Sequence, residues 1–258
     1  MNLIKTLIRK ATVAFAVFFL AVTLFLFPAG CRKEKTAPVP TYEMSTLTDR
    51  DGNVYKTVKI GNQWWMAEDL KVKTYQNGDS VLYKPTTTEW KDTLPGYCYI
   101  SVSTFVIGYL YNWNAVNDPR ILAPAGWHIP TDGEWQTLEM SVGMSADDTS
   151  KVNWRGNQEG DKLKREKATA QVYGAWQDAD NVYTVWPTNE SGFSALAGSC
   201  RLFNGIWGNP GPGGTGFWWS SSLSGNQAWY RYLDYNKSDI FRYHGDKRYG
   251  FSVRCVKN

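Results

Sequence analysis

Hydrophobic and polar positions after residue 42 fall into short runs separated by turn-forming residues, a pattern that predicts strands. An Asp-Gly-Asn turn signal at residues 51–53 separates the predicted strands at residues 45–49 and 54–60. A Gly-Asn turn at residues 61–62 leads into Gln-Trp-Trp-Met at residues 63–66. The domain is therefore expected to open with a short antiparallel meander.

The same pattern continues in the middle and in the C-terminal third of the chain. Residues 94–111 are rich in Tyr, Val, Ile and Phe and predict one or two strands. In the C-terminal third, hairpin turn signals recur at regular spacing and predict strands at residues 216–223, 228–235, 239–243 and 249–257. Along the last of these, hydrophobic side chains from Tyr249 to Cys255 fall on one face, with Ser252 and Arg254 on the other.

One segment carries a clear helical signal. Thr131 can cap a helix, and Glu134 stands three residues later, as in a capping box. Trp135, Leu138 and Val142 follow at spacings of three and four residues and form one apolar face. The sequence therefore predicts a helix that begins at this box.

The fold class predicted from these elements is α+β: an antiparallel sheet with one clear helix and long loops. A second, short helix is expected near residues 161–167. No internal repeat of fixed period and no second linker is visible, so residues 42–258 are interpreted as one domain.

The first thirty residues have the three-part layout of a secretion signal, with a basic start, an uncharged stretch at residues 11–27 and small residues before Cys31. The uncharged stretch is also at the short limit of a membrane-spanning helix, so a simple anchor is the alternative. We expect a lipoprotein, because Ala-Gly-Cys resembles a lipobox, although Pro28 stands where an aliphatic residue is usual. Residues 1–30 are then the lipoprotein signal peptide.

Cys31 is the expected lipidation site. Diacyl attachment together with the N-terminal acyl chain exceeds the two membrane signals that stable anchoring requires. Residues 31–41 are polar, contain two prolines and are interpreted as a solvated tether. The expected partner is thus the membrane, through the lipid anchor, and the expected location is the cell envelope, at the outer membrane. The sequence leaves open whether the domain faces the periplasm or the surface.

Charge and aromatic content narrow the class of ligand. Lys5, Arg9 and Lys10 are three of the 28 basic side chains, and the remaining 25 nearly balance the 24 acidic ones. Such a surface gives no electrostatic attraction to phosphate backbones, so nucleic acid is not an expected partner. All 13 Trp and 15 Tyr lie after Cys31, which predicts an aromatic core or an aromatic-lined surface.

Ordered motifs over residues 48–257 resemble the Fibrobacter succinogenes major paralogous domain family. They read DGNVYKTVKIG at 51–61, WMAEDL at 65–70, GYLYNW at 108–113, LAPAGWHIPT at 122–131, TNESGFSAL at 188–196, WWSS at 218–221, AWYR at 228–231 and GFSVRCVK at 250–257. The resemblance implies a divergent C-type-lectin-like fold, akin to that of sulfatase-modifying domains. It implies no activity, because function depends on sites rather than on folds.

Three cysteines follow Cys31, and in an exported chain they can oxidise. The resemblance implies a disulfide between Cys98 and Cys255, which would leave Cys200 as a buried free thiol. A disulfide between Cys200 and Cys255 is the alternative, because sequence does not fix connectivity.

The chemistry-bearing residues do not form an enzyme pattern, so no catalytic residue is assigned. His128 and His244 lack the spacing of a zinc site, and no Gly-x-Ser-x-Gly elbow is present. Asp178 and Asp180 alternate before Asn181 but lack the glycine and distal Glu of a calcium loop. We expect a structural His128, a solvated His244, solvated loop acids, no metal and no cofactor.

Aromatic residues in glycine- or asparagine-rich loops are the candidate ligand contacts. Trp207 lies between Asn204 and Asn209 in a loop rich in glycine and proline, and Tyr243 is a lesser candidate. Aromatic faces stack on sugar rings, while asparagine offers a donor and an acceptor for hydroxyl groups. The competing interpretation is that such aromatics, Trp176 and Trp186 included, fold back onto the sheet as core.

The function expected from the sequence is a non-catalytic, envelope-anchored binding or adhesion module for a glycan or another surface component. The first alternative is a structural or assembly component of the outer envelope that recognises protein. The second alternative is a degenerate enzyme of the sulfatase-modifying type. Neither the ligand nor the oligomeric state follows from the sequence.

Overall fold

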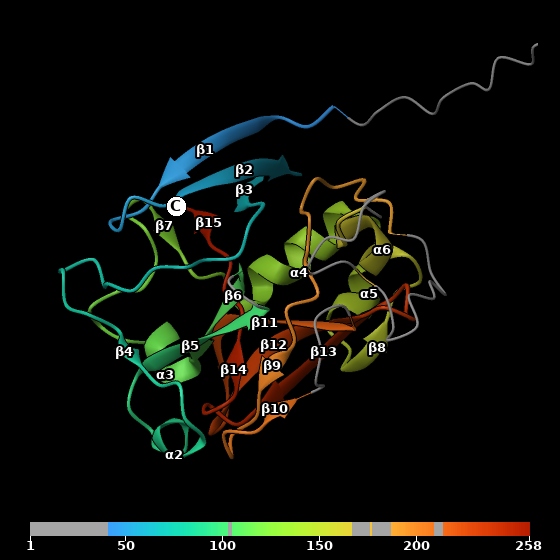
Figure 1. Ribbon diagram of the computed structural model, residues 1–258. Helices are drawn as coiled ribbons and strands as arrows, with labels where there is room; N and C mark the ends of the chain where they lie inside the picture. The colour runs from blue at the N-terminus through green and yellow to red at the C-terminus, as the bar shows by residue number, and fades with distance from the viewer. Residues whose placement is uncertain (1–40, 103–104, 167–175, 177–186, 209–213) are drawn as a thin grey trace, which may run out of the picture. The chain divides into compact units, whose positions relative to one another are not determined.

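Three β-sheets organise the part of the chain that the computed structural model describes, which is residues 41–102, 105–166, 176, 187–208 and 214–258 (Figure 1). Nearly all strand pairs are antiparallel, the exception being the pair β4–β5. The α+β class is thus confirmed in its coarse form, as mostly antiparallel sheets with a few short helices. The expectation of one sheet is wrong, because strands that are neighbours in sequence are divided among three.

The first sheet has the order β1-β2-β3-β15-β7. Its strands are β1 (Met44–Thr48), β2 (Val54–Ile60), β3 (Gln63–Met66), β15 (Val256–Lys257) and β7 (Trp127–His128). The predicted opening meander is confirmed in β1, β2 and β3.

The second sheet has the order β10-β9-β14-β6-β5-β4. Its strands are β10 (Trp207–Gly208), β9 (Cys200–Arg201), β14 (Gly250–Phe251), β6 (Phe105–Asn112), β5 (Gly96–Val102) and β4 (Leu82–Tyr83). The two longest, β5 and β6, are the pair predicted over residues 94–111.

The third sheet has the order β11-β12-β13-β8. Its strands are β11 (Thr215–Ser224), β12 (Gln227–Asp234), β13 (Ile240–Gly245) and β8 (Asn153–Arg155). The three hairpin strands β11, β12 and β13 were predicted to within about two residues at each end. No local pattern indicated β8, which pairs with β13 from a distant part of the chain.

The last predicted strand, at residues 249–257, is broken in two. β14 belongs to the second sheet and β15 to the first, so the chain crosses between sheets at residues 252–255. The predicted alternation survives: Phe251, Val253 and Cys255 share one core cluster, whereas Arg254 points the other way and pairs with Asp69. Between β14 and β15 the backbone stays paired, because Ser252 forms an isolated parallel bridge with Trp218 and the Val253 carbonyl accepts from the Leu70 N–H.

The helices are short and local in origin. They are α2 (Thr87–Trp90), α3 (Trp113–Val116), α4 (Asp132–Ser141), α5 (Ala146–Thr149) and α6 (Glu159–Leu163). The capping box is confirmed, since Thr131 accepts from the Glu134 N–H and the Glu134 side chain accepts from the Thr131 N–H. The second predicted helix exists as α6 but begins and ends earlier than expected.

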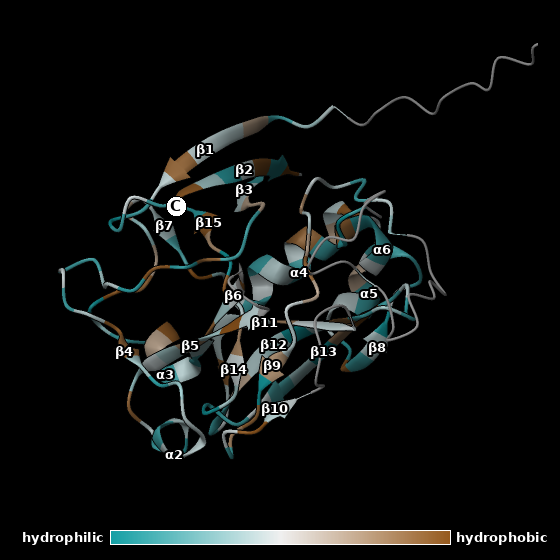
Figure 2. Ribbon diagram, in the orientation of Figure 1, coloured by the Kyte–Doolittle hydropathy of each residue, from teal (hydrophilic) through white to brown (hydrophobic). Residues whose placement is uncertain are grey.

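α4 packs with its apolar stripe inward, and Figure 2 shows hydrophobic and hydrophilic residues alternating along it. The rings of Trp135 on α4 and Trp65 on β3 lie 5.0 Å apart, and both side chains are buried. Phe193 contacts both rings and closes the cluster. This aromatic contact joins the helix to the first sheet.

A compact unit runs from Pro40 to Asn258, and Met1–Val39 forms a separate unit outside the described residues. Within the described residues, no helix is long and apolar enough to cross a membrane. The predicted signal peptide and the greater part of the tether, Cys31 included, therefore lie in the part that is not described.

Candidate ligand-binding surfaces

The hairpin that joins β9 to β10 presents a group of exposed apolar side chains. The Leu202 N–H donates to the Ile206 carbonyl at 2.8 Å, and the Gly205 N–H donates to the Leu202 carbonyl. Gly205 has a φ of +81°, and a Cβ there would lie 2.5 Å from the Thr87 carbonyl oxygen of α2. Only glycine fits this turn against the helix without a shift of the backbone.

The tip of this hairpin consists of Phe203, Ile206 and Trp207, and we call these three residues the hairpin tip. Their side chains are 41%, 56% and 39% exposed. Hydrophobic residues scattered singly on a surface are normal, but these three large side chains lie within five positions and form one exposed apolar patch. The hairpin tip is therefore a candidate binding surface.

One face of the Trp207 ring packs against a buried arginine. The guanidinium of Arg201 lies 4.5 Å from the Trp207 ring centroid and 5.5 Å from that of Trp90. Arg201 is 1% exposed, and its Nε donates to the Gly205 carbonyl and its Nη2 to the Pro85 carbonyl. The indole thus rests on a fixed cation, with one face of the ring covered and part of its surface in solvent.

A second exposed aromatic surface lies on the third sheet, and we call it the aromatic face. It is a continuous set of rings, from 38%-exposed Tyr243 inward to half-buried Phe217. Phe217 stacks on Tyr232 with centroids 4.5 Å apart, and Trp154 lies 5.1 Å from Tyr232. The members are Trp154, Phe217, Tyr230, Tyr232, Phe241 and Tyr243.

Cross-strand register explains how these rings come together. Tyr230 stands opposite Tyr243, and Tyr232 stands opposite Phe241. Side chains two residues apart on one strand share a face of the sheet. The sequence contains a signal for this surface, namely aromatic residues at alternating positions of two adjacent predicted strands. Only aromatic residues in loops were considered as ligand contacts from the sequence, and this surface was therefore not predicted.

The predicted ligand contacts divide between the two surfaces. Trp207 is exposed as expected, whereas Asn204 uses its Oδ1 to accept from the Ile206 N–H and so fixes the turn. Asn209 lies outside the described residues. Tyr243 is exposed on the aromatic face, which is separate from Trp207. Cys200 on β9 packs in the core cluster with Trp219 and Phe251. Because side chains alternate along a strand, the next residue, Arg201, and its partner Trp207 lie on the opposite face of the sheet.

For Trp176, the interpretation as core is confirmed. Trp176 is buried and donates from its ring nitrogen to the Ala195 carbonyl, so it belongs to the core. Trp186 lies outside the described residues, as do Asp178, Asp180 and Asn181. No cluster of His, Cys, Asp or Glu that could hold a metal ion occurs among the residues that the structure describes.

His128 has the structural role expected of it. Its Nε2 lies 2.7 Å from Glu134 Oε1, and its Nδ1 lies 2.7 Å from Asn258 Oδ1. Both ring nitrogens are therefore engaged, and neither is free to activate a serine hydroxyl. His244 was expected to be solvated at a turn, but it lies within β13 and stacks on Tyr243.

The expected disulfide is absent from this structure. Cys98, Cys200 and Cys255 are all unpaired and buried. Cys98 packs in a separate cluster with Trp90 and Leu110, away from the cluster that contains Cys200 and Cys255. Burial raises the pKa of the Cys98 and Cys200 thiols to about 12 and that of Cys255 further. Neither pairing with Cys255 is thus formed.

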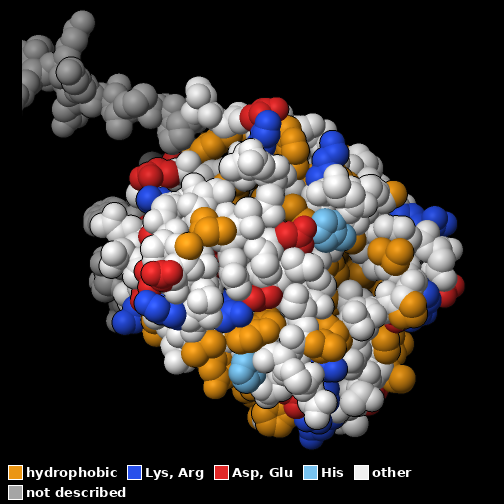
Figure 3. All heavy atoms as spheres, turned by 180° about the vertical axis from the view of Figure 1, so that it is seen from behind, with side chains coloured by type: hydrophobic (Ala, Val, Ile, Leu, Met, Phe, Trp, Pro, Cys, Tyr) orange, Lys and Arg blue, Asp and Glu red, His pale blue; other side chains and the backbone are white. Residues whose placement is uncertain are grey.

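Charges on the surface are mixed. Figure 3 shows basic and acidic side chains interspersed over one face of the molecule, with hydrophobic side chains gathered on the lower part of that view. This distribution agrees with the near balance of charges after residue 31. On the face shown, the described side chains form no single charged field that would attract a polyanion from a distance.

The fold and these surfaces define a class: an α+β domain of antiparallel sheets that exposes aromatic side chains on a rigid frame. A family model described as the Fibrobacter succinogenes major domain matches residues 58–257, and the chain belongs to this family. The comparisons with curated proteins and with solved structures found no match.

Proposed function

We propose that this chain is a non-catalytic lipoprotein of the cell envelope whose domain is a binding or adhesion module for glycans. In this proposal Cys31 carries the lipid at the outer membrane, and residues 42–258 form a divergent C-type-lectin-like domain. Membership of the family, the three-part N-terminal segment and the two aromatic surfaces support the proposal.

The observation that carries the proposal is the support of Trp207 by Arg201. A ring that stacks on a sugar must present its face without losing much conformational freedom on binding. The buried guanidinium 4.5 Å from the ring, itself held by two backbone carbonyls, provides that support before any ligand arrives. Trp207 begins β10 directly after a turn whose backbone conformation is fixed by Gly205 and Asn204.

The hairpin tip lies far from the first strand of the domain. Within the unit that begins at Pro40, β1 lies at one end and the β9–β10 hairpin lies at the opposite end (Figure 1).

Glycan-array binding of residues 42–258 tests the proposal. We expect Trp207→Ala to remove most binding and to leave the melting temperature nearly unchanged, because the ring is at the surface. Leu223→Ala is the matched control, since Leu223 is a hydrophobic side chain exposed by 50% on another hairpin. Equal binding by Trp207→Ala and the wild-type domain would reject Trp207 as the anchor. Tyr243→Ala would then show whether the aromatic face binds instead.

A second candidate function, recognition of an envelope protein, is favoured by one observation. Ile206 is the most exposed member of the hairpin tip, and an aliphatic side chain contributes more to a protein interface than to sugar binding. Capture of the domain on isolated envelopes separates the two functions. Periodate oxidation of the envelopes should abolish glycan-dependent capture, whereas protease treatment and Ile206→Asp should abolish protein-dependent capture.

A further inference from the structure

Four tyrosine rings meet on the second sheet, and we call them the tyrosine cluster. Tyr83 and Tyr99 are stacked, with centroids 5.3 Å apart and planes 7° from parallel, and Tyr97 and Tyr109 are also 5.3 Å apart. Tyr99 and Tyr109 are direct partners across β5 and β6. The cluster is thus built by strand register and not by a loop.

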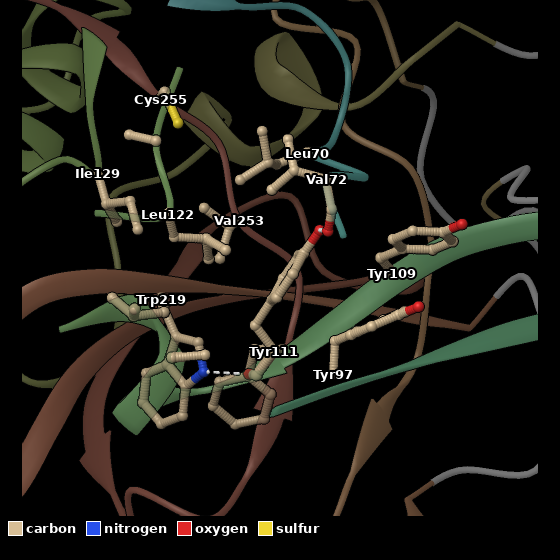
Figure 4. Close-up of a cluster of buried hydrophobic side chains, with 14 of the residues drawn as sticks. Leu70, Val72, Tyr97, Tyr109, Tyr111, Leu122, Ile129, Trp219, Val253 and Cys255 are labelled. Atoms are coloured by element: carbon tan, nitrogen blue, oxygen red, sulfur yellow. Dashed lines mark hydrogen bonds between the residues drawn. The ribbon is translucent and has the colours of Figure 1, made fainter. Parts of the chain in front are cut away.

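The tyrosine cluster opens to solvent on one side. Tyr83 is 40% exposed and Tyr99 is half-buried, whereas Tyr97 and Tyr109 are buried behind them. Figure 4 shows Tyr97 and Tyr109 side by side with their hydroxyl groups directed to the same side, away from the buried aliphatic residues. Tyr111, the next ring inward, turns its hydroxyl to the Val72 carbonyl instead. Two aromatic surfaces and several hydroxyl groups therefore share one exposed patch.

One lysine borders this patch. Lys73 is exposed and forms no ion pair with any residue that the structure describes. Lys73 Nζ lies 5.9 Å from the Tyr109 ring centroid, and a hydrogen bond to Tyr109 raises the pKa of Lys73, so its ammonium stays charged. Asp51 lies beside Lys73: its carboxylate accepts from the Lys73 N–H and the Thr74 hydroxyl, and its charge contributes to the raised pKa of Lys73.

We propose that the tyrosine cluster and Lys73 form a second binding site, for an anionic sugar unit of a polysaccharide. The exposed Tyr83 ring and the half-buried Tyr99 ring offer surface for a sugar ring, tyrosine hydroxyls donate and accept hydrogen bonds, and the Lys73 ammonium matches a negative substituent. A purely apolar partner would leave Lys73 and the hydroxyls unsatisfied, and a neutral glycan would not use the charge.

This site is independent of the hairpin tip. Cys98 lies between Tyr97 and Tyr99 on β5 and points into the Trp90 cluster, on the side of the sheet where Arg201 contacts Trp90. Because side chains alternate along a strand, the tyrosine cluster and Trp207 lie on opposite faces of the second sheet. Failure of one site therefore leaves the other untouched, and Trp207→Ala is expected to retain anionic binding.

Binding of the full chain, in detergent, to polygalacturonate and to its methyl ester tests the proposal, since the pair differs only in charge. Dextran sulfate against dextran is the parallel pair, and it distinguishes sulfate from carboxylate as the charged group. We expect each free acid to bind more tightly than its neutral partner, with affinity that falls as salt rises. Lys73→Met should weaken this binding about tenfold, as loss of a charge-assisted hydrogen bond does.

The matched control is Lys237→Met, because Lys237 is also an exposed lysine that lies over an aromatic ring, 5.7 Å from that of Trp154 on the third sheet. Its binding should equal that of the wild-type chain. Tyr83→Ala should weaken binding, whereas Tyr83→Phe, which keeps the ring, should weaken it less. Equal affinity for charged and neutral polymers, equal loss in Lys73→Met and Lys237→Met, or no binding to either acid would overturn the proposal.

Discussion

Buried charges join α4 to the third sheet, where two carboxylates of the helix contact three arginines. Asp132 accepts from Arg231 at 2.7 Å and from Arg242 at 2.7 Å, and Glu139 accepts from Arg231 and Arg155. Each of these side chains is buried, so loss of one partner would leave the others uncompensated. The network therefore fixes how the helix lies on the sheet.

Asp132 makes stability depend on pH in a defined window. Burial alone would raise the pKa of Asp132, but hydrogen bonding to Arg242 and the charge of Arg231 outweigh it and lower the pKa to about 2. A lowered folded-state pKa means that ionised Asp132 stabilises the fold above its unfolded value near 4, and that this contribution is lost as pH falls towards 2. Urea unfolding at several pH values should show a loss of roughly 2 kcal/mol across this window.

Asp132→Asn is the corresponding variant. It should cost about 3–5 kcal/mol at pH 7, because two arginines stay buried without their shared carboxylate. It should also flatten the dependence of unfolding free energy on pH between 4 and 2. An unchanged pH profile in Asp132→Asn would show that other carboxylates govern acid unfolding.

The three buried cysteines should be unreactive in the folded protein. Because Cys98, Cys200 and Cys255 are buried and their pKa values are raised, a maleimide should modify none of them in the native protein at pH 7.5. In denaturant without reductant, peptide mapping should find all three modified. Fewer than three modified cysteines after unfolding would mean that a disulfide forms in the envelope after all.

Helix α4 depends on its first turn. Thr131→Ala removes the acceptor for the Glu134 N–H and should cost about 1 kcal/mol. Glu134→Ala removes the acceptor for the Thr131 N–H and also the contact with His128, so it should cost more, on the order of 2 kcal/mol. Thermal melts would measure both, and Glu134→Gln should recover part of the loss. Melting temperatures equal to that of the wild-type protein in all three variants would mean that the helix does not begin at Thr131.

The start of α4 and the C-terminal hairpins were predicted from local sequence, but the equally local short helices α2, α3 and α5 and the elements with distant partners were not. The capping box at Thr131 and the hairpins of β11, β12 and β13 arise from residues within a few positions of one another. β8 gains its strand conformation only by pairing with β13, more than eighty positions later in the chain. Its three residues carry no periodicity long enough to be recognised.

At the scale of the whole molecule, the proposed lipid anchor can be tested directly. If the Cys31 thiol is the acylation site, as we propose, Cys31→Ala should leave the precursor uncleaved and should abolish incorporation of radiolabelled palmitate. Membrane fractionation and mass spectrometry of the N-terminus would measure both effects. Cys98→Ala is the control and should be lipidated normally. Palmitate still incorporated into Cys31→Ala would reject the lipoprotein assignment.

The candidate sites could be predicted only in part from the sequence. Loop composition identified Trp207 as an exposed aromatic, but it gave no sign of Arg201, the residue that supports the ring. Composition left two interpretations open for Trp176, ligand contact or core, and burial of the side chain decides for core. The tyrosine cluster was missed, since its four members come from three strands whose order in the sheet is not written in their local sequence.

Local patterns in the sequence were sufficient to predict the family, the α+β class, the helix start at Thr131 and most hairpin strands, because turns, caps and alternation act over a few residues. Three features arise only in the folded chain: the division into three sheets, the crossing of residues 252–255 between two of them and the unpaired state of the cysteines. These features depend on which distant segments share a face. Such contacts follow from packing and from the register of the whole chain, and no local pattern encodes them.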